Sequence, residues 1–590
     1  MTTKAKQLKE MTTETELLEK EKIIEAKQRW EETTEAEQIS DETIELELFR
    51  QGRYEELWRR CCGFIDLSLE DFMNIQRRLL LEQIGLLKKC ELGRVLMGGA
   101  RPRTVEEFRE QVPLTTYKDY APYLLKQRMD VLPRKPMLWQ HTSGRSGEYD
   151  FKWCPLTSRQ WEETESLLIA LLCFCTCKKR GEFNFKLHDK CLYGAAPRPY
   201  VTGNVFGYGF SRYIDFLPPA DEAETMPFPE RFQTGFKLAL SEGLDFFSSL
   251  PSVMVAAGER FSQRGRSGSI KPLLRQPKML FRIMRGVIKS KLAHRPMLPK
   301  DVWSLKGLIT GGSDGSVYAE KIKEIWGRPP LDLYCSTEAM IIAMQTWDYQ
   351  GLTFFPALNF LEFIPEEESL KSRADPHYQP STLLLDEVKP GENYELVITN
   401  FHGGPFVRYR QGDMIKITAL RNEQLNIDIP QMAYHSRVDD MIDIAGFTRL
   451  TETVIWKAIE NTGIAYEDWA ARKELKDKPI LHLYLEPRGS DHLTAEQVAT
   501  LVDEQLKILD TPYSELESYL GLKPLEVTFV PQGAFERYML KQQAAGAELG
   551  RMKVSHINPT ADVLDFLVSS ARQVTVPSKE ERQPETISTR

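Results

Sequence analysis

The fold class of this chain follows most directly from residues 305–338, which read LKGLITGGSDGSVYAEKIKEIWGRPPLDLYCSTE. Two short apolar runs, LKGLITGG and LDLYCSTE, are separated here by a run with a helical pattern. The same alternation extends over about residues 136–420, where CLYGAA and YELVITN are further strand-like runs. Strands separated by helices are typical of α/β proteins with parallel strands. The sequence therefore predicts a large, multi-layer α/β body.

A smaller α+β unit is expected after about residue 440. The run LHLYLEP alternates apolar and polar residues, as a half-buried strand does. Thr494 and Gln497 form a capping-box pattern at the start of a helix, and LEVTFVP follows as another strand. These runs predict a strand–helix–strand unit.

Composition and charge divide the chain into five segments. A charged helical arm is expected at residues 1–50 and the large body at residues 51–436. A hinge at residues 437–440 would lead to the small domain at residues 441–570. Residues 571–590 are polar, and we expect them to be disordered.

The overall composition is that of an ordinary globular protein. The chain has 590 residues, of which 42% are hydrophobic and 27% charged. This excludes a mainly disordered chain and a disulfide-stapled mini-protein. The net charge of −8 and the pI of about 5.8 argue against a basic nucleic-acid binder, so no nucleic-acid partner is expected.

The cysteines and the N-terminus predict a cytoplasmic location. The number of cysteines, 9, is odd, and no CxxC pair occurs, so we expect reduced, structural thiols. The first residues contain no apolar signal-peptide run. The longest apolar run is about half the ~20 residues that a membrane span needs.

One segment reverses the sign of the overall charge. Residues 260–300 contain 12 Lys and Arg residues and no Asp or Glu, and the part that reads MLFRIMRGVIKSKL is amphipathic. A solvated surface helix would have this pattern. Peripheral contact with an anionic membrane surface, or with a phosphorylated ligand, would also produce it.

The first candidate site is a loop rich in small residues, HTSGRSG, at residues 141–147. Small hydroxylated residues and glycines let backbone N–H groups turn toward an anion, as in a phosphate-binding loop. A Ser/Gly-rich surface turn would look the same.

The second candidate is the end of the strand LDLYCSTE, where Glu338 follows an aromatic ring and three small residues. Ligands gather at the carboxyl ends of strands in open α/β sheets, and a carboxylate there could hold Mg²⁺ against phosphate oxygens. The alternative is a helix N-terminal Glu that complements the helix dipole.

Two further candidates lie near the boundary between the two units. In VRYRQGD, Asp413 follows a glycine turn, where its carboxylate could accept both hydroxyls of a ribose or simply occupy a β-turn. In SRVDD, Arg437 could pair with an anion, and the following carboxylates could act as a swivel between domains.

The order and spacing of these four motifs resemble those of the adenylate-forming superfamily of acyl-CoA synthetases, peptide-synthetase adenylation domains and luciferases. TSGRSG is similar to the phosphate loop, YCSTE to the aromatic–small–small–Thr–Glu motif, YRQGD to the ribose-binding motif, and SRVDD with AGFTRL to the hinge. Within this superfamily, the likeness is greatest to the auxin-responsive acyl acid amido synthetase family. Four further segments resemble those of this family: FREQVPLTTYKDYAPYLLKQR, GLITGGSDGSVYAEKIKEIWG, FFPALNFLEFIPEE and GRMKVSHI. The resemblance covers about residues 50–560 and implies the adenylate-forming enzyme fold, with a mobile C-terminal domain.

The resemblance also implies roles for individual residues. The phosphate loop would be formed by Ser143, Gly144, Arg145, Ser146 and Gly147. Further nucleotide contacts would come from Gly311, Gly312, Tyr334, Ser336, Thr337, Asp413 and Arg437. Within this set, Tyr334 would stack on adenine, Thr337 would contact the α-phosphate, and Asp413, assisted by Arg437, would bind the ribose.

The remaining implied roles concern metal, hinge and charge. Glu338 would hold Mg²⁺, and Asp439 would be the hinge about which the small domain turns. Lys553 would stabilise the charge that develops at the carboxylate and the α-phosphate, although an ordinary surface Lys remains the alternative.

Two places depart from the family pattern. Arg145 stands where the family usually has a small hydroxylated residue, and the stretch after Gly147 is about two residues longer than usual. Ser555 and His556 replace the Pro-Arg expected after the terminal Lys.

The resemblance implies an enzyme that uses ATP and Mg²⁺ to activate a small carboxylic acid as an acyl-adenylate. The first hypothesis for the second step is transfer to an amine, as in amino-acid conjugation. One alternative is transfer to CoA, which forms a thioester. Another is a non-catalytic ligand-binding or assembly protein on the same scaffold.

Overall fold

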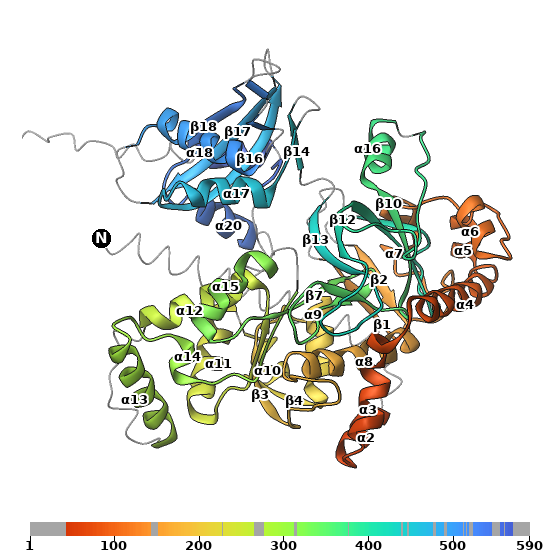
Figure 1. Ribbon diagram of the computed structural model, residues 1–590, viewed down its shortest axis with the longest axis horizontal. Coiled ribbons are helices and arrows are strands. Elements are labelled where there is room, and N and C mark those ends of the chain that lie inside the picture. The colour runs from red at the N-terminus through yellow and green to blue at the C-terminus, as the bar shows by residue number, and fades with distance from the viewer. Residues whose placement is uncertain are drawn as a thin grey trace, which may run out of the picture. The chain divides into compact units, whose positions relative to one another are not determined.

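Figure 1 shows the computed structural model of the chain. The structure describes residues 43–142, 152–226, 228–264, 277–311, 315–375, 377–437, 441–444, 448–475, 479–488, 493–510, 513–514, 516–517, 523–544, 555–559 and 561–569. The chain divides into two compact units, residues 1–438 and 439–590. The arm expected at residues 1–50 lies outside the described residues as far as residue 42, and the tail expected at residues 571–590 lies wholly outside them.

The centre of the first unit is a sheet of 11 strands in the order β10-β11-β12-β13-β9-β8-β7-β6-β5-β3-β4. One half is parallel, as the alternation of strands and helices predicts. Its strands are β3 (Asp189–Tyr193), β4 (Ile214–Leu217), β5 (Phe246–Ser249), β6 (Gly307–Gly311) and β7 (Leu331–Ser336). Most of the connecting segments are helical, with α9 (Val201–Asn204), η2 (Val205–Gly209), η3 (Phe210–Arg212), α10 (Ala220–Ala223), α11 (Phe228–Glu242), α12 (Pro251–Arg264), α13 (Pro277–Leu292), α14 (Pro299–Val302) and α15 (Gly315–Trp326).

The other half of the sheet is antiparallel, which the sequence did not indicate. Its strands are β8 (Met340–Met344), β9 (Leu352–Phe354), β10 (Asn359–Pro365), β11 (Asn393–Asn400), β12 (Tyr409–Ala419) and β13 (Gln431–Arg437). The prediction of parallel strands is therefore wrong for YELVITN, which is β11. It pairs antiparallel with both β10 and β12, although α16 (Glu366–Ala374) lies between β10 and β11 in sequence. A helix between two strands therefore does not by itself make them parallel, because the chain can also return along the neighbouring strand in the opposite direction.

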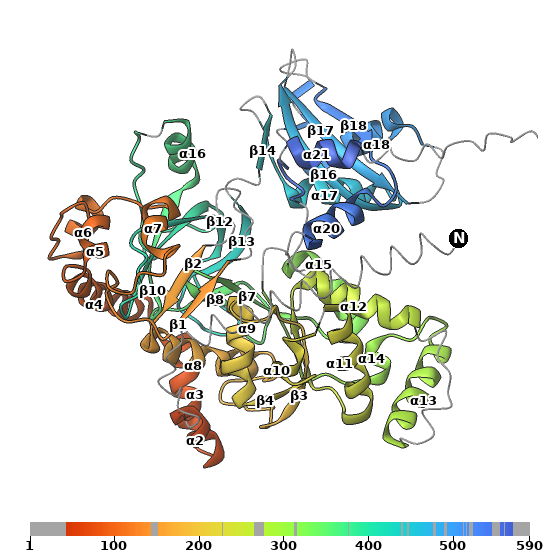
Figure 2. The ribbon, with the colours of Figure 1, turned by 180° about the vertical axis from the view of Figure 1, so that it is seen from behind.

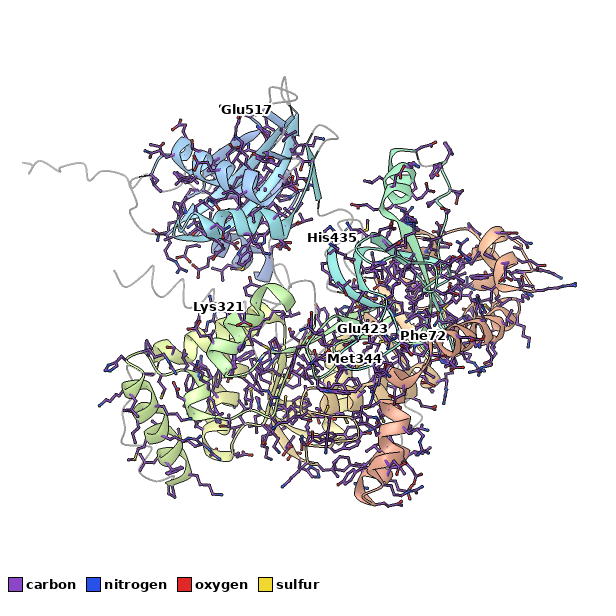
Figure 3. The ribbon with its side chains drawn as sticks, in the orientation of Figure 1. Phe72, Lys321, Met344, Glu423, His435 and Glu517 are labelled. Atoms are coloured by element: carbon purple, nitrogen blue, oxygen red, sulfur yellow. The ribbon has the colours of Figure 1, made fainter. Side chains whose placement is uncertain are left out.

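Helices precede the sheet and cover part of it. They are α2 (Ile44–Arg50), α3 (Tyr54–Cys61), η1 (Gly63–Asp66), α4 (Leu69–Leu87), α5 (Glu91–Leu96), α6 (Val105–Gln111), α7 (Tyr117–Leu124) and α8 (Ser158–Phe174), with the hairpin β1 (Leu138–His141) and β2 (Trp153–Leu156) before α8. Phe72 on α4 and Met344 on β8, both labelled in Figure 3, are fully buried. The main hydrophobic core thus joins the first helices to the central strands.

The second unit is the α+β unit that the sequence predicts (Figure 2). Its elements are β14 (Met441–Ile444), β15 (Thr448–Thr451), α17 (Glu452–Asn461), β16 (Tyr466–Leu475), β17 (Pro479–Pro487), α18 (Ala495–Leu509), β18 (Leu525–Phe529), α20 (Ala534–Ala544) and α21 (Ala561–Ser569). Strands β17 and β18 are parallel and α18 lies between them in sequence, so the strand–helix–strand prediction is confirmed. The Thr494–Gln497 capping box opens α18 as expected.

The thiols agree with the prediction of reduced cysteines. All 9 cysteines lie in the described residues and are free, and only Cys335 is exposed. Among the helices that the structure describes, none is both long and apolar enough to cross a membrane.

Candidate active site

The site lies where the parallel and antiparallel halves of the large sheet meet, at β7 and β8 (Figure 2). Tyr334 is a buried residue near the end of β7, and Glu338 lies in the turn that joins β7 to β8. Because β8 returns antiparallel to β7, Glu338 does not begin a helix. The alternative interpretation of Glu338 as a helix N-terminal residue is therefore wrong.

The second part of the site comes from β12. Asp413 lies inside this strand, where it is paired with Arg437 of β13. The preceding Gly412 has a φ of +78°, and the register between β11 and β12 shifts across this point, so the backbone forms an irregularity within one strand. Gly412 thus belongs to a bulge within β12, and not to the expected turn between two elements. The bulge changes the direction in which the Asp413 side chain points.

The structure brings the two motifs together. The hydroxyl of Tyr334 donates a hydrogen bond of 2.7 Å to Oδ2 of Asp413, which is 79 residues away in sequence. Gln411 Nε2 donates to Ser336 Oγ at 2.9 Å, which links the same two strands a second time. The ring of Tyr434 on β13 lies 6.2 Å from the ring of Tyr334, so a second aromatic side chain borders the site. Next to it on β13 is His435, labelled in Figure 3, whose pKa is lowered by burial.

Glu338 is held by residues that the sequence analysis did not select. The hydroxyl of Tyr409 donates to Oε1 of Glu338 at 3.2 Å. Burial, together with the nearby Glu338 carboxylate, raises the pKa of Tyr409 well above its usual value. Tyr409 therefore stays protonated and donates this hydrogen bond to the Glu338 carboxylate.

Two side-chain amides position the turn that carries Glu338. Asn400 Nδ2 donates to the carbonyl oxygen of Glu338 at 3.0 Å, and Gln140 Nε2 donates to that of Thr337 at 2.9 Å. Tyr409 belongs to the YRQGD motif, so the sequence contained a signal for it. Gln140 and Asn400 act on backbone carbonyls from distant strands, and no local sequence pattern reports such contacts.

Two ion pairs with buried carboxylates fix β12 and therefore Asp413. Arg408 pairs with Glu362 on β10 at 2.9 Å, and Arg410 pairs with Glu395 on β11 at 2.6 Å. The Arg408 guanidinium also donates to the carbonyl oxygen of Val112 at 2.6 Å. Strand β12 is thus tied both to the sheet and to the segment that follows α6.

The remaining predicted residues are only partly described. Gly311 is the last residue of β6, beside Leu333 of β7. Arg437 is described through its backbone pairing with Asp413, and not through its side chain. The predicted residues outside the described part of the chain are Ser143, Gly144, Arg145, Ser146, Gly147, Gly312, Asp439 and Lys553.

Comparison with known families decides the membership of the chain. Three family models match it: the GH3 family N-terminal domain at residues 61–182, the central domain at residues 352–437 and the C-terminal domain at residues 451–561. Together they cover more than half of the sequence, in the family's order. The chain belongs to the GH3 family.

Curated relatives match this GH3 family member over most of its length. The indole-3-acetic acid-amido synthetase GH3.8 of Oryza sativa subsp. indica is 23% identical, over 86% of this chain and 92% of that protein. The jasmonoyl–L-amino acid synthetase JAR4 of Nicotiana attenuata is 27% identical, over 78% of this chain and 88% of that protein.

Solved structures show the same fold. An acyl acid amido synthetase, AtGH3.15, in complex with 2,4-DB, has a TM-score of 0.61 at 18% identity, over 86% of this chain and 95% of that chain. A 2-hydroxyisobutyryl-CoA ligase in the postadenylation state has a TM-score of 0.58 at 15% identity, over 86% of this chain and 93% of that chain. The prediction of the adenylate-forming enzyme fold is confirmed.

Proposed function

We propose that this chain is an ATP-dependent ligase that activates a carboxylic acid as an acyl-adenylate and transfers the acyl group to the amino group of an amino acid. Membership of the GH3 family supports this activity, since relatives are named as amido synthetases for indole-3-acetic acid and jasmonic acid. The observation that carries it is the hydrogen bond between Tyr334 and Asp413, with Glu338 at the end of the same strand as Tyr334.

In the first half-reaction, an oxygen of the substrate carboxylate attacks the α-phosphorus of ATP and pyrophosphate leaves. Asp413 would accept hydrogen bonds from the ribose hydroxyls, because an ionised carboxylate is a pure acceptor. The Tyr334 hydroxyl holds this carboxylate in place, and its ring would lie against the adenine. These contacts position the α-phosphorus before the reaction begins, which lowers the entropic part of the barrier.

The charge on Glu338 suits Mg²⁺ between the protein and the phosphates. Its carboxylate is half-buried and accepts a hydrogen bond from Tyr409. Mg²⁺ commonly binds nucleotide enzymes through one or two carboxylates and the phosphate oxygens of the substrate. Bound there, the ion would neutralise negative charge on the phosphates.

In the second half-reaction, the amine nitrogen attacks the acyl carbon, AMP leaves, and the nitrogen loses a proton. No covalent bond to the protein is needed, so the work of the chain is positioning and charge stabilisation. The roles proposed for the other motifs rest on the resemblance: phosphate binding by residues 143–147, charge stabilisation by Lys553 and Arg437, and domain rotation at Asp439.

The proposal is tested by the exchange of labelled pyrophosphate into ATP, measured with a broad panel of aromatic, indolic and aliphatic carboxylic acids. We expect exchange that depends on one class of acid and on Mg²⁺. Absence of exchange with every acid would favour a non-catalytic scaffold. With an active acid in hand, product analysis with amino acids and with CoA in separate reactions decides between an amide and a thioester, and a thioester alone would overturn the proposed acceptor.

A further inference from the structure

Helix α13 belongs to the first unit, and its most buried residues are small. It lies at the edge of that unit, beside α11 and α14, in both Figures 1 and 2. Its buried residues are Gly286 and Ser290. A Cβ at Gly286 would fall 2.9 Å from a methyl group of Val302, so α13 approaches α14 closely at this point, and the same face carries the half-buried Met279 and Ile283.

Four large apolar residues of α13 lie on the opposite side of the helix. Phe281, Met284, Ile288 and Leu292 follow one another at spacings of three, four and four residues, which places them in one stripe along the helix. Their exposed fractions lie between 54% and 76%. A surface helix of a globular protein normally buries such a stripe, and here it faces outward.

Cations flank this apolar stripe. Lys278, Arg285 and Lys291 are exposed on the helix, and the whole segment 260–300 has no Asp or Glu. One arginine has a structural task, since Arg282 donates to the carbonyl oxygens of Leu240 and Ser241 at the end of α11 at 2.8 and 2.7 Å. Arg282 thus helps to attach α13 to α11, whereas Lys278, Arg285 and Lys291 are exposed at the surface.

We propose that α13 is a membrane-docking helix that lies on an anionic lipid surface. The apolar stripe would enter the boundary between headgroups and acyl chains, while the flanking cations contact the lipid phosphates and carboxylates. A helix with a cationic polar face and a Phe/Leu-rich apolar face binds a membrane in this way. This surface is separate from the adenylation site, so the inference does not depend on the proposed ligase activity.

The charge and size of this surface favour lipid over a second copy of the chain. Two copies that met through α13 would bring cations of both helices together. Four partly exposed side chains form a patch smaller than the about 800 Å² per partner of a stable interface. A bilayer requires no matching protein surface, and anionic lipids complement the cations.

The test is co-sedimentation of the full chain, without ATP or acid, with vesicles of phosphatidylcholine alone or with added phosphatidylserine. We expect binding to the phosphatidylserine vesicles, at least about tenfold weaker binding to neutral ones, and weakening by salt. Equal binding to both kinds of vesicle would overturn the role of the cations.

Matched variants locate the binding surface. Phe281→Asp with Ile288→Asp is expected to lower vesicle affinity at least about tenfold. Arg285→Gln with Lys291→Gln is expected to lower it at least about tenfold on anionic vesicles only. The control is Ile508→Asp on α18, an isoleucine of the second unit that is 73% exposed.

The outcomes separate lipid from protein partners. If vesicle binding survives both double variants, or is lost equally in the control, α13 is not the docking helix. If no vesicle is bound and Phe281→Asp instead abolishes a concentration-dependent dimer, the stripe is a protein interface and the lipid proposal is wrong. Because these side chains are exposed, we expect each variant to unfold at the same temperature as the unchanged protein. A thermal unfolding measurement of each variant checks that it is folded.

Discussion

Glu338 is the single residue on which the proposed chemistry depends most directly. Glu338→Gln keeps the shape of the side chain and the hydrogen bond with Tyr409, but it removes the negative charge. We expect pyrophosphate exchange to fall at least about 100-fold, because a lost transition-state charge contact costs roughly 3 kcal/mol.

The matched control is Tyr409→Phe, which keeps the carboxylate and removes its hydroxyl partner. We expect this variant to lose about tenfold or less, since one hydrogen bond to a charged group contributes about 1.5 kcal/mol. Near-normal exchange in a folded Glu338→Gln protein would remove Glu338 from the metal and phosphate contacts.

His556 illustrates how one substitution in a family motif has a structural consequence. It stands where the family pattern has Arg, three residues after Lys553. Its Nδ1 lies 2.6 Å from Glu452 on α17, its Nε2 lies 2.9 Å from Asp468 on β16, and its ring stacks on Trp469. These contacts, with the backbone bonds of residues 556 and 558 to Ala471, attach this segment to β16.

The two carboxylates make the stability of the second unit depend on pH. Burial alone would lower the pKa of His556, but the hydrogen bonds to Asp468 and Glu452 outweigh it and raise the pKa from 6.5 to about 9. The folded form therefore binds the proton more tightly than the unfolded form. The stabilising effect of protonated His556 is complete below pH 6.5 and is lost as the pH rises through about 9.

We expect the free energy of unfolding of this unit to fall by up to about 3 kcal/mol over that range. Chemical denaturation at a series of pH values measures it. In His556→Arg the guanidinium stays charged throughout, so this contribution to the pH dependence should disappear. An unchanged pH dependence in His556→Arg would show that another group causes it.

The site residues also show what a sequence can reveal at this scale. Tyr334, Glu338 and Asp413 were found because their types and their order form motifs. Gln140 and Asn400 were not, because an amide that binds a backbone carbonyl across the fold leaves no pattern in either segment. Pair contacts of this kind depend on the three-dimensional course of the chain.

At the level of elements, strand β12 shows why local structure was only partly predictable. The apolar run MIKIT predicts a strand, and Gly412 predicts a break before it. The observed strand continues through the glycine, because Asp413 pairs with Arg437 and the bulge absorbs the extra residues. Strand direction was predicted correctly only in the parallel half, since α16 separates β10 and β11 in sequence and these strands are nevertheless antiparallel.

The pair between Arg408 and Glu362 predicts a large effect on the stability of β12. Both side chains are buried, and Arg408 also binds the carbonyl oxygens of Arg109 and Val112. Arg408→Met would remove the nearer cation from the buried Glu362 carboxylate and leave only Arg109, at 3.7 Å. We expect a loss of about 3–5 kcal/mol in the free energy of unfolding of the first unit, measured by denaturant titration.

An exposed pair serves as the control. Arg159 on α8 pairs with Glu162 and Glu163 at 2.7 and 2.5 Å, but its side chain is 54% exposed. Arg159→Met should cost less than about 1 kcal/mol, because water screens such pairs. Equal losses in the two variants would mean that burial of the Arg408 pair does not determine its contribution.

At the scale of the whole molecule, each of the two units has its own hydrophobic cores. Within the described residues, the buried clusters of the first unit end at Met432 and those of the second begin at Ile442. The sequence predicted this division from a change in pattern near residue 440. Among the described residues, each unit therefore has buried apolar clusters of its own, as cooperative unfolding of that unit requires.

This organisation predicts two separable unfolding transitions in calorimetry of the intact chain. Arg408→Met should lower the midpoint of one transition, and His556→Ala, measured at neutral pH, should lower the midpoint of the other. Adding ATP with an active acid should raise the transition that Arg408→Met lowers, since Tyr334 and Asp413 belong to that unit. One transition that both substitutions shift equally would show that the two units unfold as one cooperative body, and the pH dependence assigned to His556 would then act on the stability of the entire chain.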